Sequence, residues 1–123
     1  MNLPKSEEQV IQIIWEKERV FMKDIVDAYP EPKPAASTIA TLLKRLLNKN
    51  AIAFTQYGNV REYHALWKKE AYFSTHFKGV IKDHFNDSVS QFASFFTSND
   101  NLTEEQLQEL KKIVDQQIET RKK

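Results

Sequence analysis

The chain has 123 residues, of which 41% are hydrophobic and 28% are charged, so it is globular and long enough for one domain or two small ones. It contains no cysteine, which excludes a disulfide framework, a thiolate metal site and a cysteine nucleophile. No apolar run approaches the roughly 18 residues of a membrane span, and the first residues lack the apolar core of a signal peptide. We therefore expect a cytoplasmic protein with no membrane insertion and, with only 2 glycines, a mainly α fold.

The net charge of +1 hides an uneven distribution of charged residues. Residues 32–69 contain seven cations and one anion, so this segment carries +6 and the rest of the chain carries −5. A basic segment in a nearly neutral protein is typical of a nucleic-acid site. Chance clustering of lysines is the alternative interpretation.

The first part of the chain predicts two short helices. The first begins at a capping box, in which Ser6 and Gln9 satisfy each other's backbone N–H groups, and residues 10–15 supply its buried face. After a charged link, a second helix is predicted over Met22–Tyr29. Three prolines within residues 30–34 then end the helix and predict a stiff connector.

A third amphipathic helix, predicted over Ala35–Asn50, has the pattern of a DNA-recognition helix. Its leucines and Ile39 recur at three- and four-residue steps and form one buried face. On the opposite face short hydroxyl side chains precede long cations, so small groups can approach bases in a major groove while cations meet phosphates. The residues expected to contact DNA are Thr38 and Thr41 at base edges, and Ser37, Lys44, Arg45 and Lys49 at phosphates. The alternatives are an ordinary surface helix and, for Arg45, an ion pair with an acid of the first two helices.

After Asn50 the apolar residues alternate, which predicts two strands joined by a turn at Gly58. Three helices followed by a hairpin predict a winged helix-turn-helix N-terminal domain over residues 1–67. Near the hairpin tip, Arg61 is a further candidate for a phosphate contact. A hairpin that only closes the core is the alternative.

Residues 68–123 predict a C-terminal helical dimerisation region. An apolar stripe rich in phenylalanine predicts one helix of about 28 residues, and a capping box of Thr103 and Gln106 begins a last helix. Two helices cannot cover so many aromatic residues, so we expect a homodimer. The residues expected at the dimer interface are Phe73, Phe77, Ile81, Phe85, Phe92, Phe96, Leu107, Leu110 and Val114. Folding of the stripe onto the N-terminal domain, or docking of a different protein, are the alternatives.

No pattern in the sequence indicates an enzyme. His76 and His84 lie about two turns apart on one predicted helix, too far to share a metal ion. There is no Gly-rich phosphate loop and no recognisable catalytic motif around a serine or carboxylate. We therefore expect no catalytic activity, no metal and no cofactor.

The third helix also carries a family resemblance. The chain resembles the penicillinase and methicillin-resistance repressor (BlaI/MecI) family, whose typical pattern there is T-hydrophobic-x-T-L-hydrophobic-x-R-L-x-x-K-G. That pattern is met by Thr38, Ile39, Thr41, Leu42, Leu43, Arg45, Leu46 and Lys49. The IIW end of the first helix, the end of the hairpin and the closing LTEEQLQELKKIV segment also fit, so the resemblance covers nearly the whole chain. Asn50 replaces the usual Gly and can adopt the left-handed conformation of a helix cap.

The resemblance implies a homodimeric winged helix repressor that binds inverted-repeat promoter DNA and blocks transcription. It further implies a membrane sensor metallopeptidase as a partner, and release from DNA by a cut in the dimerisation region near Phe95 and Phe96. The alternative function is a winged helix protein-interaction module without sequence-specific DNA binding.

Overall fold

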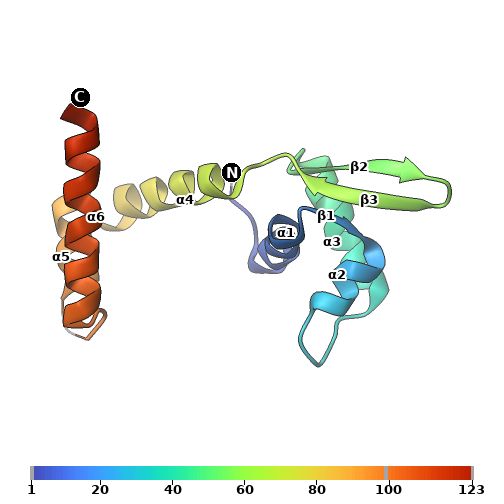
Figure 1. Cartoon of the computed structure of the whole chain (residues 1–123). Coiled ribbons are helices and arrows are strands. Elements are labelled where there is room, and N and C mark those ends of the chain that lie inside the picture. Colours follow the sequence, from blue (N-terminus) through green and yellow to red (C-terminus); the bar gives the residue numbers. More distant parts are fainter. Residues whose placement is uncertain (1, 99, 123) are drawn as a thin grey trace. The chain divides into compact units, whose positions relative to one another are not determined.

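The computed structural model describes residues 2–98 and 100–122 and has the topology of a winged helix followed by further helices (Figure 1). The elements are α1 (Lys5–Lys17), β1 (Arg19–Phe21), α2 (Met22–Ala28), α3 (Ala36–Asn48), β2 (Ile52–Tyr57), β3 (Val60–Ala65), α4 (Lys69–His84), α5 (Val89–Thr97) and α6 (Glu104–Lys122). The chain divides into two compact units, Met1–Phe77 and Lys78–Lys123. The predicted fold class is confirmed. The predicted domain boundary after Trp67 stays a prediction, because compact units describe packing and not independent folding.

Helix α1 begins earlier than the sequence pattern predicts. Its first residue is Lys5 and its N-cap is Pro4, whose carbonyl accepts a hydrogen bond from Glu8 N at 2.9 Å. No side chain caps this end, so the predicted capping box of Ser6 and Gln9 is wrong. The reason is that proline needs no hydrogen bond for its own nitrogen and so suits the start of a helix, which leaves Ser6 inside the first turn.

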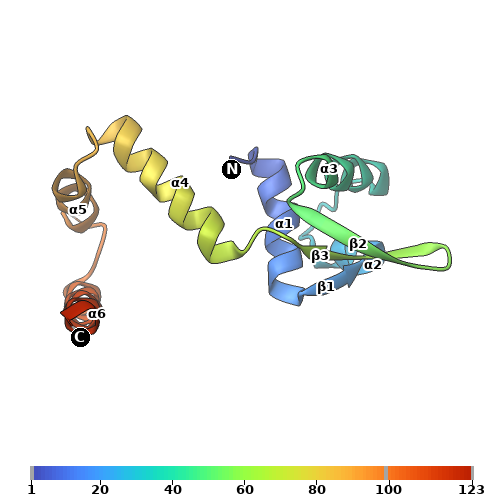
Figure 2. The same cartoon turned by 90° about the horizontal axis from the view of Figure 1, so that it is seen from above.

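A third strand, β1, begins at Arg19, the last residue of the predicted charged link, and covers the two residues predicted to lead into the second helix. It pairs antiparallel with β3, with Val20 opposite Tyr63, and β3 pairs on its other side with β2. The predicted hairpin is confirmed: Tyr57 pairs with Val60, and Gly58 takes φ +59° in the two-residue turn. The hairpin extends beyond the helices of the first unit in both views (Figures 1 and 2).

The hydrophobic core lies in the first unit, between the three helices and the sheet. Its buried residues come from every element from α1 to β3 and are Val10, Ile11, Ile13, Ile14, Val20, Ile25, Tyr29, Ile39, Leu42, Leu43, Leu46, Ala51, Ile52 and Tyr63. At about 25 cal/mol per Å² of buried apolar surface, this cluster is the main stabilising term of the winged helix. Asn50 ends α3 with φ +59°, as expected for a left-handed cap.

Tyr72 fixes the start of α4 to the rest of the first unit. Its side chain is fully buried, its hydroxyl donates to Glu8 Oε2 at 2.8 Å, and it accepts from Leu3 N at 3.3 Å. Its ring packs against Trp15 and stacks on Trp67, and the Trp15 indole N–H donates to Trp67 O at 2.8 Å. Burial, followed by the hydrogen bond to Glu8, raises the pKa of Tyr72 above its ordinary 10.0.

The substitution Tyr72→Phe should lower the free energy of unfolding by about 1–2 kcal/mol, because it leaves Glu8 and the Leu3 amide without their partner. Urea denaturation at neutral pH measures the loss. The folded state favours the neutral phenol, so this contribution is present below pH 10.0 and disappears as pH rises through the raised pKa. Tyr57→Phe, at an exposed residue of β2, is the control and should change stability little. Equal effects of the two substitutions would contradict this role of Tyr72.

The single helix of about 28 residues predicted from the apolar stripe is wrong. Helix α4 ends at His84, and α5 begins after the cap residue Ser88, whose hydroxyl accepts from Gln91 N at 3.1 Å. Asn86 and Asp87 between them have φ of +53° and +58°. Their short polar side chains tolerate the left-handed region, which stops a helix. The sequence signal was the polar run of residues 86–88 within an apolar stripe.

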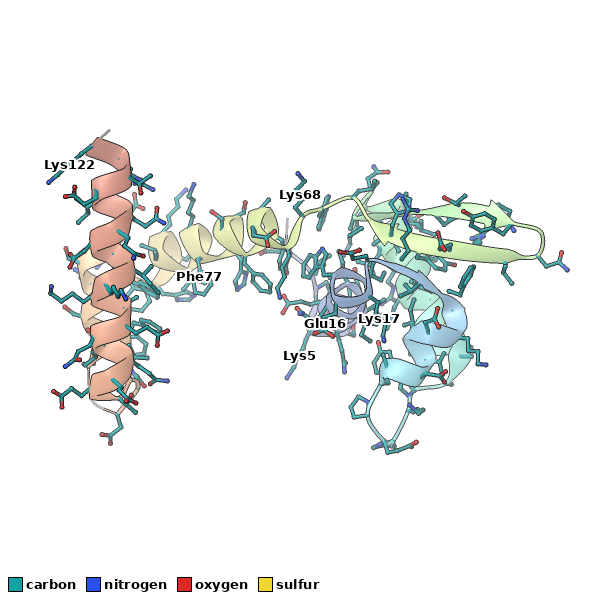
Figure 3. All side chains as sticks on the ribbon, viewed as in Figure 1. Lys5, Glu16, Lys17, Lys68, Phe77 and Lys122 are labelled. Atoms are coloured by element: carbon teal, nitrogen blue, oxygen red, sulfur yellow. The ribbon has the colours of Figure 1, made fainter. Side chains whose placement is uncertain are left out.

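The second unit differs from the first in its packing. Phe85 contacts the rings of Phe92 and Phe95, each at 5.5 Å between centroids. The predicted capping box of α6 is confirmed, because Thr103 Oγ1 accepts from Gln106 N and the Gln106 side chain accepts from Thr103 N. Side chains project from all sides of α6 (Figure 3), and none of the described residues after Tyr72 is buried.

Candidate nucleic-acid interface

The orientation of α3 is set by its apolar face. Ile39, Leu42, Leu43 and Leu46 are at most 7% exposed and lie in the core that α1 shares. With 3.6 residues per turn, burial of these four side chains turns the opposite face to solvent. The exposed polar residues of that face are Ser37, Thr38, Thr41, Lys44, Arg45 and Asn48. The structure therefore brings together the hydroxyls and the two cations that the sequence placed on one face.

The N-terminal half of this face carries small polar groups, which would allow nucleic acid to approach the helix closely. Its N-cap is Ala35, which has no polar side chain, so N–H groups of the first turn can meet a phosphate. The Thr41 hydroxyl donates to the Ser37 carbonyl at 3.0 Å. The hydroxyl proton of Thr41 is thus used within the helix, but the oxygen lone pairs and the methyl group of this side chain remain available to a ligand. Thr41 can therefore accept from a base amino group or contact a thymine methyl.

The two cations of α3 are exposed and available. Within residues 2–98 and 100–122, neither Lys44 nor Arg45 has an acidic partner within 4.0 Å. The alternative in which Arg45 pairs with an acid of the first two helices is thus not observed. A cation without a partner in the protein breaks no ion pair when it contacts a phosphate, and the contact releases counterions from the nucleic acid.

Lys49, in contrast, is held by the protein. Its ammonium contacts Glu7 Oε1 at 2.5 Å, and the Glu7 side chain is 3% exposed while that of Lys49 is 38% exposed. A charged carboxylate that is nearly buried destabilises the fold unless a cation lies beside it. This ion pair joins the C-terminal end of α3 to the first turn of α1. Contact of Lys49 with DNA stays a prediction that would require sharing or breaking this pair.

Lys33 is a second cation that the basic segment supplies to the fold. Its ammonium donates to the carbonyls of Tyr29 at 2.7 Å, Asp27 at 3.1 Å and Val26 at 3.3 Å. These carbonyls lie at the C-terminal end of α2, where a cation is favourable. Lys33 is one of the cations of the basic segment over residues 32–69, and its capping role was not predicted from the sequence. A lysine a few residues after a helix that ends at proline is the signal that could have indicated it.

The hairpin places Arg61 beside the same face. Its guanidinium lies 4.1 Å from the centroid of the Phe54 ring and is exposed. Stacking on a ring orients the guanidinium without using its N–H donors. At the tip, Gln56 Nε2 donates to Gly58 O at 2.8 Å, and Tyr57 is exposed. The hairpin therefore carries one oriented cation and a polar tip.

The residues predicted at the dimer interface fall in both units. Phe73 and Phe77 belong to the first unit, where Phe73 packs on Trp15 at 5.8 Å between ring centroids. The other seven lie in the second, and Phe92 stacks on Phe96 at 5.8 Å. A role for any of them between two copies stays a prediction.

Two further findings concern the described residues only. No group of three or more His, Cys, Asp or Glu side chains is arranged to hold a metal ion. No helix there is both long and apolar enough to cross a bilayer.

Comparison with known proteins identifies the family. The family model described as penicillinase repressor matches residues 3–116. The chain belongs to the penicillinase repressor family. It is also 24% identical over 116 residues to the penicillinase repressor of Bacillus licheniformis, covering 94% of this chain and 91% of that protein. The resemblance drawn from the α3 motif is thereby confirmed, and the protein is a transcriptional regulator of the repressor type and not an enzyme.

The ion pair of Glu7 and Lys49 in this repressor can be tested by a double-mutant cycle. Lys49→Gln should lower the free energy of unfolding by about 1–2 kcal/mol, because it leaves a nearly buried carboxylate unpaired. With Glu7→Gln already present, the same change should cost about 1 kcal/mol less. Urea denaturation of the four proteins gives the coupling. Fully additive losses would contradict the pair.

Proposed function

We propose that this repressor is a homodimer that binds an inverted-repeat operator, with α3 of each copy in a major groove, and so blocks transcription. The observation that carries the proposal is the exposed face of α3, on which short hydroxyl side chains precede two cations without acidic partners in the described ranges. Membership of the penicillinase repressor family supports the regulatory role. Operators are in the cytoplasm, where we place the protein.

We expect the small residues of α3 to recognise the bases. Thr38 and Thr41 are one turn apart near the N-terminal half of the helix, which is the part that reaches base edges in helix-turn-helix proteins. Because the Thr41 proton is occupied by Ser37 O, we expect Thr41 to read an amino group or a thymine methyl.

Phosphate contacts then fix the register of the helix. Ser37 and the first-turn amides can hold one phosphate, while Lys44 and Arg45 meet the backbone further along α3. Arg61 on the hairpin can reach the backbone or the minor groove beside it. Lys49 would contact a phosphate only by sharing or breaking its pair with Glu7.

Two substitutions separate base readout from phosphate contact. Thr41→Ala should change the sequence preference, with a cost of about 1–3 kcal/mol on the preferred site if a base contact is lost. Lys44→Ala should weaken binding to all sequences alike and reduce the slope of log affinity against log salt by about 1. In vitro selection from random duplexes, followed by titrations over a salt series, measures both. Unchanged binding in both variants would remove α3 from the interface.

The uneven packing of the two units supports a dimer. The core cluster lies within the first unit, whereas no described residue of the second is buried. Exposed apolar residues there include Val89, Phe95, Phe96, Ile113, Val114 and Ile118. Leu107, Leu110 and Val114 share one face of α6 by their spacing. A helical unit without its own core is normally stabilised by association, and a two-fold dimer would present two α3 helices to a palindrome.

The substitution Val114→Glu should shift the repressor from dimer to monomer, because it places a charge in the apolar face of α6. Gln116→Glu adds the same charge to another face of α6 and is the matched control. Sedimentation equilibrium should show dissociation, at least tenfold weaker, for the first variant only. A wild-type chain that remains monomeric would favour a heterologous protein partner, as in a protein-interaction module.

The proposed mechanism of release from DNA rests on the family resemblance. A membrane sensor metallopeptidase would act on the chain near Phe95 and Phe96, directly or by signal. These residues lie in the last part of α5 and are 60% and 42% exposed. The helix ends at Thr97, so local fraying there would give a protease access to the backbone.

A further inference from the structure

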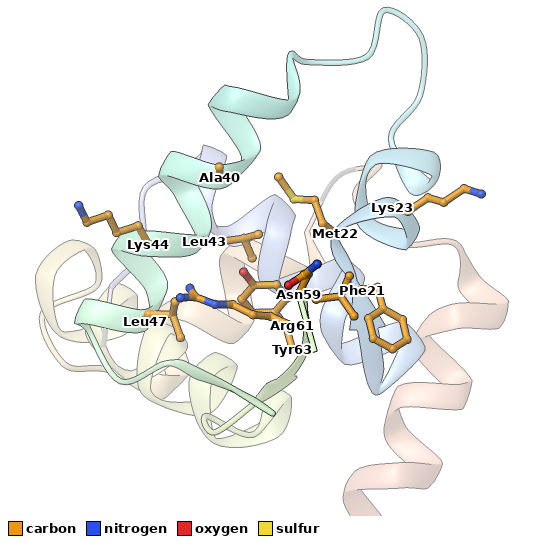
Figure 4. Close-up of a pocket in the computed structure, with 11 residues that line it drawn as sticks. Phe21, Met22, Lys23, Ala40, Leu43, Lys44, Leu47, Asn59, Arg61 and Tyr63 are labelled. Carbon is orange, nitrogen blue, oxygen red and sulfur yellow. The ribbon is translucent and has the colours of Figure 1, made fainter. Parts of the chain in front are cut away.

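A cavity of about 780 Å³ lies in the first unit, beside the proposed DNA-binding face of α3 (Figure 4). It is bounded by the end of β1, the start of α2, one side of α3, and β3 with the turn before it. Its lining residues are Phe21, Met22, Lys23, Ala40, Leu43, Lys44, Leu47, Asn59, Val60, Arg61 and Tyr63. The volume falls within the range of roughly 300–1,000 Å³ that is usual for sites of small organic ligands.

The lining combines apolar walls with cations and contains no acidic side chain. Met22 and Leu43 face one another from α2 and α3, and Arg61 lies across the middle beside Leu47 (Figure 4). Lys23 and Lys44 extend on opposite sides (Figure 4). Lysine stems can cover apolar surface while their ammonium groups stay in water. The cavity is therefore complementary to a molecule that is apolar in its body and negatively charged at an edge.

The DNA backbone alone does not account for this composition. A phosphate can use Arg61 or Lys44, but the sugar–phosphate chain is polar and gains little from the wall formed by Met22, Leu43 and Leu47. A ligand that removes this apolar wall from water gains binding free energy in proportion to the apolar area that it covers.

We propose that this cavity binds a small organic anion with an apolar body, such as an aromatic or aliphatic sulfonate or carboxylate, and that the bound anion competes with DNA. Competition follows because Lys44 and Arg61 belong to both sites, and this second part rests on the proposed function. Occupancy of one site then excludes the other by mass action: the apparent Kd for DNA rises in proportion to one plus the ratio of the free anion concentration to the dissociation constant of the anion. The repressor would thereby respond to a small molecule without being cut.

Two fluorescent probes with the same aromatic body test the binding directly. 1-Anilinonaphthalene-8-sulfonate carries one negative charge, whereas N-phenyl-1-naphthylamine carries none. The full chain should bind the sulfonate at least about tenfold more tightly, because charge-assisted contacts with the rim cations add to apolar burial. Equal affinities for the two probes would contradict the proposed charge recognition.

Matched variants assign the binding to the cavity. Ala40→Phe fills it from the exposed side of α3 and should weaken sulfonate binding about tenfold, whereas Ala36→Phe, at the exposed start of the same helix, should not. The double variant Lys44→Gln/Arg61→Gln should remove the preference for the charged probe, and Lys82→Gln, on α4, is the control for loss of charge. Circular dichroism checks that each variant is folded.

Amide chemical shifts provide the location independently of affinity. On addition of the sulfonate, the changes should cluster in residues 21–23, 40–47 and 59–63. Changes confined to residues 78–122 would show that the probe binds the apolar helices of the second unit, and would overturn the proposal.

Competition is measured last, with a duplex obtained by selection. The duplex should displace the sulfonate completely, and the apparent Kd for DNA should rise linearly with sulfonate concentration, as the directly measured sulfonate affinity requires. Binding of both at once would overturn the competition but not the ligand site. If the chain binds no DNA, the direct titrations still decide the ligand site, so the two proposals fail separately.

Discussion

The burial of one face of α3 is the constraint on which the rest of the first unit depends. Four apolar side chains fix the rotation of the helix about its axis, and this rotation decides which side chains meet solvent. Two lysine contacts then hold its surroundings: the pair of Lys49 with Glu7 joins the C-terminal end of α3 to α1, and Lys33 binds the carbonyls at the end of α2, before the connector that leads to α3. A helix held in this way would lose little conformational entropy on binding DNA as we propose.

This arrangement changes how the basic segment should be interpreted. Lys33 and Lys49 are already held by carbonyls and by a carboxylate, whereas Arg61 is oriented by the Phe54 ring, which does not use its N–H donors. Lys44 and Arg45 remain as cations of α3 without an acidic partner in the described residues. The net charge of a segment thus overstates the number of its cations that are available for phosphate contacts, and the salt dependence of the proposed DNA binding should reflect the smaller number.

The sequence was sufficient for the features that depend on local periodicity. The apolar spacing of α3, the turn at Gly58 and the capping box at Thr103 each depend on neighbours a few residues apart, and all are present. The sequence pattern did not predict features that depend on contacts between residues far apart in the chain. Strand β1 exists because Val20 pairs with Tyr63, more than forty residues away, and Lys49 faces Glu7 only after α1 and α3 have packed. The break at residues 86–88 was missed because the apolar stripe continues across it. The candidate site was predictable as a helix face, but its division into free and engaged cations was not.

Sequence-specific DNA binding by the face of α3 that carries Ser37, Thr38, Thr41 and Lys44 can be tested by hydroxyl-radical footprinting of the full chain on the promoter region upstream of its own gene, over a salt series. We expect protection of a short inverted repeat, with two protected half-sites about one or two helical turns apart and an affinity that falls steeply as salt rises. Absence of any protection at low salt, with the chain folded, would show that this face does not bind the promoter.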